Sequence, residues 1–99
     1  MIKNDVLSWQ KMQPIIRKGD LTDHGGVVLD GFGGMDLSGQ PAAGVGHMVS
    51  CPKCKGIFPI IQGSSQYSIE GRAVALHGMK TACGASLIAS QQQFLADKW

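Results

Sequence analysis

The sequence is poor in the residues that usually fill a protein core or mark a membrane or nucleic-acid protein. Only six of its 99 residues are aromatic (two Trp, one Tyr and three Phe), and no apolar run approaches the roughly 18 residues of a membrane-spanning helix. The formal net charge is only +2 and the basic residues form no long run, which argues against nucleic-acid binding. Fourteen glycines instead favour turns over long helices.

Cysteine is also scarce, and its count is odd. Disulfides within the chain would leave one of the three cysteines unpaired, and no basic, apolar leader opens the sequence. We therefore expect a reducing compartment in which the cysteines bind metal. A single domain of this length buries a modest core, and structural zinc would compensate with about 10–16 kcal/mol of apparent binding energy that couples to folding.

Three segments repeat one spacing, in which a potential metal ligand follows a glycine by five residues. The pairs are Gly19 and His24, Gly46 and Cys51, and Gly78 and Cys83. A fourth candidate, Cys54, forms a C-x-x-C turn with Cys51, and such a turn brings both sulfurs to one side. Thiolate and imidazole are the ligands of tetrahedral zinc. The sequence therefore predicts a zinc site formed by His24, Cys51, Cys54 and Cys83.

The repeat extends beyond the ligands and predicts an all-β fold. Each unit has a lead-in ending in glycine, a ligand loop, an apolar strand and a second strand with period-two alternation. The lead-ins are 14–19, 41–46 and 73–78, the apolar strands 26–29, 57–61 and 85–88, and the second strands 35–40 and 67–72. The third unit stops near Phe94, so we expect its last strand to be truncated or to become a tail. Such units share one core by wrapping around a common axis.

Other residues near the ligands have alternative interpretations. His47 and His77 adjoin the repeated glycines and compete as ligands, although neither holds the repeated position. A general base at Asp20 or Asp23 is a further alternative, but hydrogen bonding within the loops is favoured. Lys53, Lys55 and Lys80 solvate the loops or offset thiolate charge. Buried free cysteines and a redox C-x-x-C are the alternatives to zinc.

Four protein ligands would close the metal site. A catalytic zinc keeps one position open for water, so we predict no catalytic residues and no enzyme activity. A small zinc hydrolase would need such an open position together with a functional Asp23. A free-standing zinc module that binds nucleic acid or protein is the main alternative function.

The segment 41–44 reads Pro-Ala-Ala-Gly, and the three ligand loops lie in 19–26, 46–54 and 80–85. With this segment and these loops the sequence resembles the PAAR-repeat family of type VI secretion spike-tip proteins, which has Pro-Ala-Ala-Arg at the first place and similar loops. The resemblance covers about residues 14–95. Departures are Gly44 for the signature arginine, His47 and Met79 for a loop aspartate, and Cys54 where many relatives have histidine.

The resemblance implies a small cone of three pseudo-symmetric β-hairpin repeats, with zinc near its pointed end. Its base would cap a trimeric valine-glycine-repeat (VgrG) spike protein, one tip per trimer, and recruit secreted effectors. The implied role is structural, without nucleic acid or stable membrane association. The protein would be cytoplasmic in the producing bacterium and then translocated with the spike.

Three regions are expected along the chain. Residues 1–13 form an N-terminal arm or short helix, because Ile2, Val6 and Trp9 follow helical spacing. Residues 14–95 form the repeat domain, and 96–99 form a C-terminal tail.

Overall fold

The computed structural model describes residues 12–97, and within that range it contains ten short strands and no helix. No helix among these residues could therefore span a membrane. Most of the expected N-terminal arm, residues 1–11, lies outside the described residues. The strands are β1 (Met12–Pro14), β2 (Leu21–Thr22), β3 (Asp36–Leu37), β4 (Gln40–Pro41), β5 (Met48–Cys51), β6 (Gly56–Pro59), β7 (Ser68–Ile69), β8 (Arg72–Ala73), β9 (Leu87–Ile88) and β10 (Leu95–Asp97).

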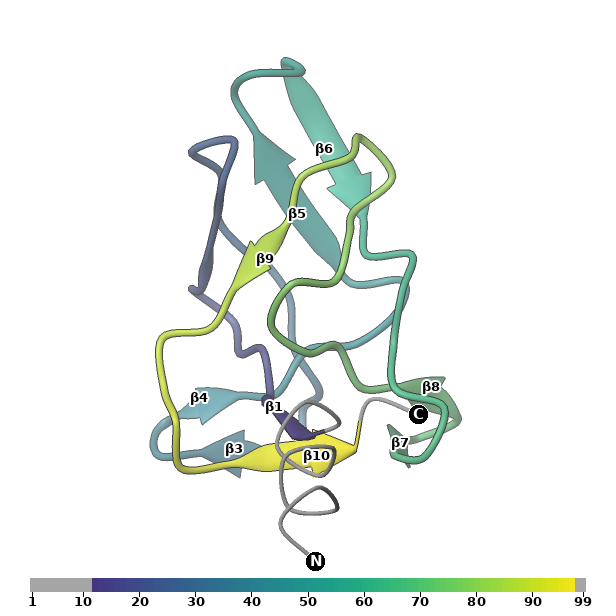
Figure 1. Cartoon of the computed structure of the whole chain (residues 1–99). Coiled ribbons are helices and arrows are strands. Elements are labelled where there is room, and N and C mark those ends of the chain that lie inside the picture. The colour runs from purple at the N-terminus through teal and green to yellow at the C-terminus, as the bar shows by residue number, and fades with distance from the viewer. Residues whose placement is uncertain (1–11, 98–99) are drawn as a thin grey trace, which may run out of the picture.

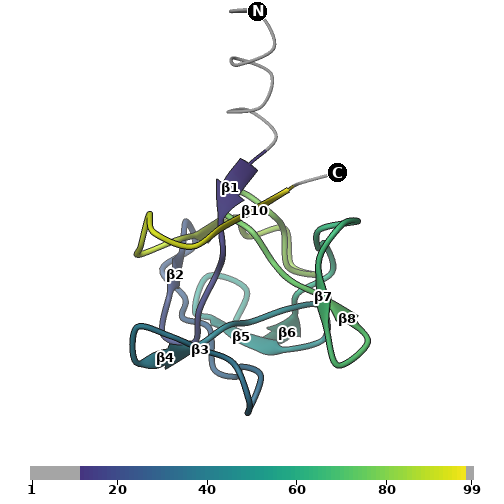
Figure 2. The same cartoon turned by 90° about the horizontal axis from the view of Figure 1, so that it is seen from below.

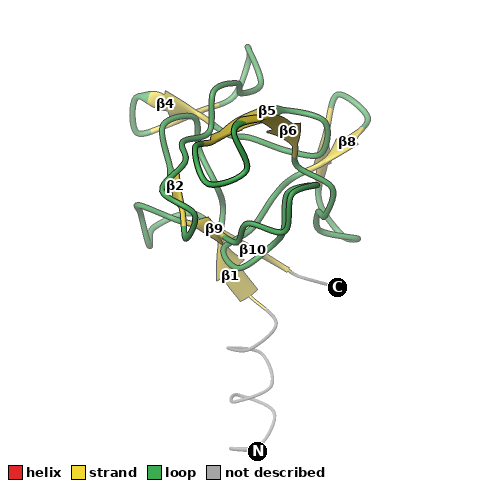
Figure 3. Ribbon diagram, turned by 90° about the horizontal axis from the view of Figure 1, so that it is seen from above, coloured by secondary structure: helices red, strands yellow, loops and turns green. Residues whose placement is uncertain are grey.

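The strands form five antiparallel pairs, which confirms the all-β fold of hairpin repeats. The pairs are β1–β10, β2–β9, β3–β4, β5–β6 and β7–β8. Three of them, β3–β4, β7–β8 and β1–β10, lie around the broad end of the molecule at three corners (Figure 2). The β5–β6 hairpin projects at the narrow end (Figure 1) and lies near the centre when seen from above (Figure 3).

The three lead-ins meet in a closed ring of backbone hydrogen bonds. The N–H of Ile16 donates to the carbonyl of Ala75 (2.9 Å), that of Ala75 to Ala43 (2.9 Å), and that of Ala43 to Ile16 (2.8 Å). All three residues are completely buried. Because a buried backbone group needs a partner, no unit satisfies its own lead-in without both neighbours.

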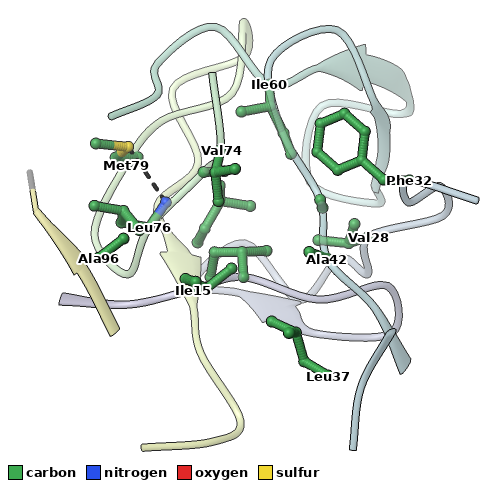
Figure 4. Packing of buried hydrophobic residues seen from close by; sticks show 14 of the residues in the cluster. Ile15, Val28, Phe32, Leu37, Ala42, Ile60, Val74, Leu76, Met79 and Ala96 are labelled. Carbon is green, nitrogen blue, oxygen red and sulfur yellow. Dashed lines mark hydrogen bonds between the residues drawn. The ribbon is translucent and has the colours of Figure 1, made fainter. Parts of the chain in front are cut away.

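The hydrophobic core is built from corresponding positions in the three units. Val28, Ile60 and Leu87 are each at most 1% exposed, and their carbonyls accept equivalent hydrogen bonds of 2.8–2.9 Å from the repeated glycines. Their side chains pack with those of the lead-ins, as Figure 4 shows for Ile60 beside Val74 and for Val28 beside Ala42. The units therefore share one core, as the repeat predicts.

The predicted second strands are hairpins rather than single strands. Residues 35–40 contain β3 and the start of β4, and residues 67–72 contain β7 and the start of β8. Both central residues of each turn have positive φ, as in a type I′ turn: 56° and 93° for Ser38 and Gly39, 52° and 82° for Glu70 and Gly71. Alternating polarity cannot distinguish a strand from a hairpin, and here a two-residue turn reverses the chain.

The expectation that the last strand of the third unit is truncated or becomes a tail was wrong. Strand β10 pairs with β1 from the other end of the chain, with Leu95 opposite Pro14. The N–H of Ile15 donates to Phe94 (2.9 Å), as Ala42 does to Met35 in the first unit. A third hairpin is thus assembled from both ends and closes the ring. It includes residues 12–13 and 96–97 of the expected arm and tail; the division of the rest of the chain stays a prediction.

Three chemically different side chains perform one task at the position after the repeated glycine. Each accepts a hydrogen bond from the backbone N–H three residues earlier. The bonds are Arg17 N to Asp20 Oδ2 (2.9 Å), Gly44 N to His47 Nδ1 (3.0 Å) and Leu76 N to Met79 Sδ (3.3 Å; Figure 4). The replacement of aspartate by His47 and Met79 therefore preserves an acceptor.

The imidazole of His47 is held in the neutral form that this bond requires. Burial lowers its pKa, and the positive charge of Arg72 lowers it further, whereas Asp30 and Glu70 act in the opposite direction. The ring also lies edge-on to Phe32, with 4.5 Å between ring centroids.

We predict that His47→Ala lowers the free energy of unfolding by about 1–3 kcal/mol, because the N–H of Gly44 loses its acceptor. His47→Asp is the matched control, since Asp20 makes the same bond in the first unit. Urea unfolding measures both. Equal stability of the two variants would contradict the assigned bond.

A second prediction concerns pH. Because the pKa of His47 is lower in the folded protein, the unfolded chain binds the proton more readily once the pH falls below its ordinary value of about 6.5. The contribution of His47 to the free energy of unfolding should therefore be constant above that pH and should decrease as the pH falls below it. The decrease should be smaller in His47→Asp. Urea unfolding between pH 7.5 and 5.5 measures this. The prediction is refuted if the free energy of unfolding decreases equally in the wild type and in His47→Asp.

Candidate metal centre

The structure brings the four predicted ligands together. One ligand atom from each of His24, Cys51, Cys54 and Cys83 lies within 4.8 Å of all the others. Nδ1 of His24 faces Sγ of Cys51 at 3.5 Å. His24, Cys51 and Cys83 come from three different units, so a metal ion held here would connect all three. Such a cluster of thiols and an imidazole could hold a metal ion.

Two threonines shape the ligand loops of the first and third units. The hydroxyl of Thr22 accepts a hydrogen bond from the N–H of Gly26 (3.0 Å), and that of Thr81 from Ala85 (3.3 Å). Both threonines are buried, and each stands two residues before a candidate ligand. The sequence interpretation missed them, although their repeated position was a visible signal.

The second unit departs from this turn because it contains five additional residues. Val27, Pro59 and Ser86 occupy corresponding positions, since each carbonyl accepts the same inter-unit hydrogen bond. Val27 and Ser86 each follow the candidate ligand of their unit by three residues, whereas Pro59 follows Cys51 by eight residues. The insertion forms the turn of the β5–β6 hairpin at the narrow end (Figure 1).

The fourth candidate ligand belongs to this insertion. Cys54 is exposed, whereas Cys51 at the end of β5 is only 1% exposed. The sulfur of Cys54 lies 3.8 Å from the backbone oxygen of Cys83. Three candidate ligands thus follow the repeat, and the fourth is added by one unit alone.

The crowded thiols differ in acidity. Burial raises the pKa of Cys83, but hydrogen bonds, above all from the Thr81 hydroxyl at 3.1 Å, bring it down to about 6. A hydrogen bond with Cys51, together with some burial, raises the pKa of Cys54 to about 11. A divalent cation would favour the thiolate of each cysteine and displace the remaining protons.

Asp23 lies on the far side of the imidazole. Its Oδ1 is 4.0 Å from Nε2 of His24 and accepts a hydrogen bond from the N–H of Ser86 (2.8 Å), which lowers the pKa of Asp23. The carboxylate therefore stays charged beside the nitrogen that faces away from the thiols. This is the position of an outer-shell group that orients a histidine ligand.

Asp20 has a structural role. It is buried, and its two oxygens accept hydrogen bonds from the N–H of Arg17 (2.9 Å) and the hydroxyl of Ser90 (2.5 Å). Both oxygens are thus occupied within the fold, which agrees with the favoured interpretation. Lys53, Lys55 and Lys80 are exposed near the ligand loops, and Nζ of Lys80 donates to Ser86 Oγ (2.6 Å).

The family model for the PAAR motif matches residues 18–89. The chain belongs to the PAAR family. This confirms the resemblance and implies a spike-tip-like protein, from a structural family, with a possible metal site. A search of the curated proteins finds no match to the chain.

The PAAR signature arginine is absent from the second unit for a steric reason. A Cβ atom at Gly44 would lie 2.7 Å from the ring of Phe32 and would collide with the backbone of Ala73. Arg17 occupies the corresponding position of the first unit, where its guanidinium donates to the carbonyl of Leu37 (2.7 Å). The arginine is therefore found in another repeat.

The two competing histidines of this PAAR protein have other partners. Nδ1 of His47 accepts from Gly44, and Nδ1 of His77 accepts a hydrogen bond from the N–H of Ala89 (3.0 Å). Neither belongs to the group of four, the one metal-ligand group found among the described residues.

Proposed function

We propose that this protein is a structural spike tip whose narrow end is pinned by zinc and whose broad end caps a trimeric spike. The observation that carries the proposal is the meeting of four potential ligand atoms, from three repeat units, within 4.8 Å of one another. Membership of the PAAR family supports the same role.

The donor set fits zinc. Three cysteines and one histidine are soft and borderline ligands, which zinc accepts in tetrahedral sites and which magnesium or calcium avoid. His24 would bind through Nδ1, because this atom faces Cys51 while Nε2 faces Asp23. Four protein ligands would leave no position for a reactive water. The proposed zinc is therefore structural, and the protein is not an enzyme.

The broad end supports a trimeric partner. Three hairpins surround it in a threefold arrangement, which matches three identical chains with one tip per trimer (Figure 2). An open depression of about 490 Å³ lies there, and its polar and apolar lining includes Leu37, Tyr67 and Phe94 from three different units. A valine-glycine-repeat spike protein would cover this surface and the strand edges around it.

A tip in the proposed position at the end of the spike would be delivered together with the spike. The tip would be made in the cytoplasm, carry effectors with the spike and be translocated with it. The family match supports this sequence of events at the level of the secretion machine.

We predict that Cys83→Ser removes most of the bound zinc and lowers the melting temperature, because the third unit loses its link to the others. The loss of zinc affinity should exceed the roughly 10–100-fold cost of removing an outer-shell partner. Elemental analysis and thermal unfolding measure both effects, with His77→Asn as control. Full zinc content and an unchanged melting temperature would show that the ligand assignment is wrong.

Co-expression with a trimeric spike protein tests the partner. Native mass spectrometry should detect one tip bound to three spike chains together with one zinc ion. Zinc binding without a spike complex would leave the metal centre intact and favour a free-standing zinc module instead.

A further inference from the structure

Cys54 differs from the other three proposed ligands in exposure and origin. It is exposed, in a turn that only the second unit possesses, whereas Cys51 is buried and Cys83 is partly buried. The ladder between β5 and β6 ends at the pair Cys51 and Gly56, so residues 52–55 form the turn outside it. A reagent in solvent therefore reaches this thiol before the others.

We propose that Cys54 is an oxidation site, and that a peroxide-class oxidant joins it to Cys51 and releases the metal. This inference rests on the proposed zinc centre. With zinc bound, all three cysteines are thiolates, so access to solvent determines which of them is oxidised first.

The chemistry balances in two steps. The sulfur of Cys54 attacks the O–O bond of hydrogen peroxide, forms a sulfenic acid and releases hydroxide. The thiolate of Cys51 then attacks the sulfenic sulfur, forms the disulfide and releases a second hydroxide. The two thiolates lose two electrons, which the peroxide accepts. Because a disulfide sulfur is a poor zinc ligand, the ion loses two of its four donors.

Cys51 is favoured over Cys83 as the partner by its position in the same hairpin. Both residues of the C-x-x-C turn can approach without moving another unit, since the turn lies outside the ladder. Cys83 lies in a loop held by Thr81, whose hydroxyl contacts its sulfur at 3.1 Å, and Thr81 is only 1% exposed. A disulfide to Cys83 would have to displace that loop.

Oxidation should loosen the narrow end and spare the broad end. A disulfide within one hairpin connects no units, whereas the metal would connect three. After its loss, His24 and Cys83 have no common ion. The buried ring of Ile16, Ala43 and Ala75 contains no sulfur and is unaffected by the reaction.

The experiment treats the zinc-loaded protein with hydrogen peroxide. A chromophoric chelator follows zinc release, a thiol assay counts free cysteines, and tryptic mapping locates the disulfide. Trypsin cleaves after Lys53, so a bond between Cys51 and Cys54 joins peptide 19–53 to dipeptide 54–55. We expect one zinc released for each two thiols lost, with this linkage. A link to Cys83, or release without any disulfide, overturns the proposal.

Cys54→His is the matched variant, because it keeps a zinc ligand and removes the thiol. It should release zinc roughly tenfold more slowly, since the exposed nucleophile is missing. Release at the wild-type rate overturns the proposal. If this variant does not fold, the disulfide map of the wild type decides alone. Absence of zinc from the purified wild-type protein would refute the metal centre. The tryptic disulfide map would still test whether peroxide joins Cys54 to Cys51.

Discussion

A ring of three backbone hydrogen bonds underlies the whole structure. Ile16, Ala43 and Ala75 each donate to one neighbouring unit and accept from the other, and all three are fully buried. An unpaired buried N–H or carbonyl is costly, so the three units must fold jointly. The ligand loops therefore converge because the lead-ins do.

The ring constrains the backbone and leaves the side chains free to vary. Asp20, His47 and Met79 accept the same hydrogen bond in three chemical forms. Gly44 stands where the signature has arginine, because Phe32 fills the adjacent space. A family signature can thus lose a residue in one unit while the geometry it serves is preserved.

The proposed metal centre combines this symmetry with one asymmetric addition. His24, Cys51 and Cys83 hold one repeated position, and their meeting was predictable from the spacing of glycine and ligand. Cys54 comes from a five-residue insertion that accounts for the whole difference between the intervals of 27 and 32 residues separating the repeated glycines. Its exposure makes this fourth proposed ligand chemically distinct from the other three.

The number of units, the all-β class and the four residues of the cluster were predictable from the amino-acid sequence, because each depends on a local spacing that recurs along the chain. The pairing of β1 with β10 arises only in the folded chain, since Pro14 and Leu95 lie at opposite ends of the sequence. The same holds for the roles of Thr22, Thr81 and His47, whose hydrogen bonds depend on loop conformation. Local patterns predict elements, whereas long-range closure depends on the shared core that they form together.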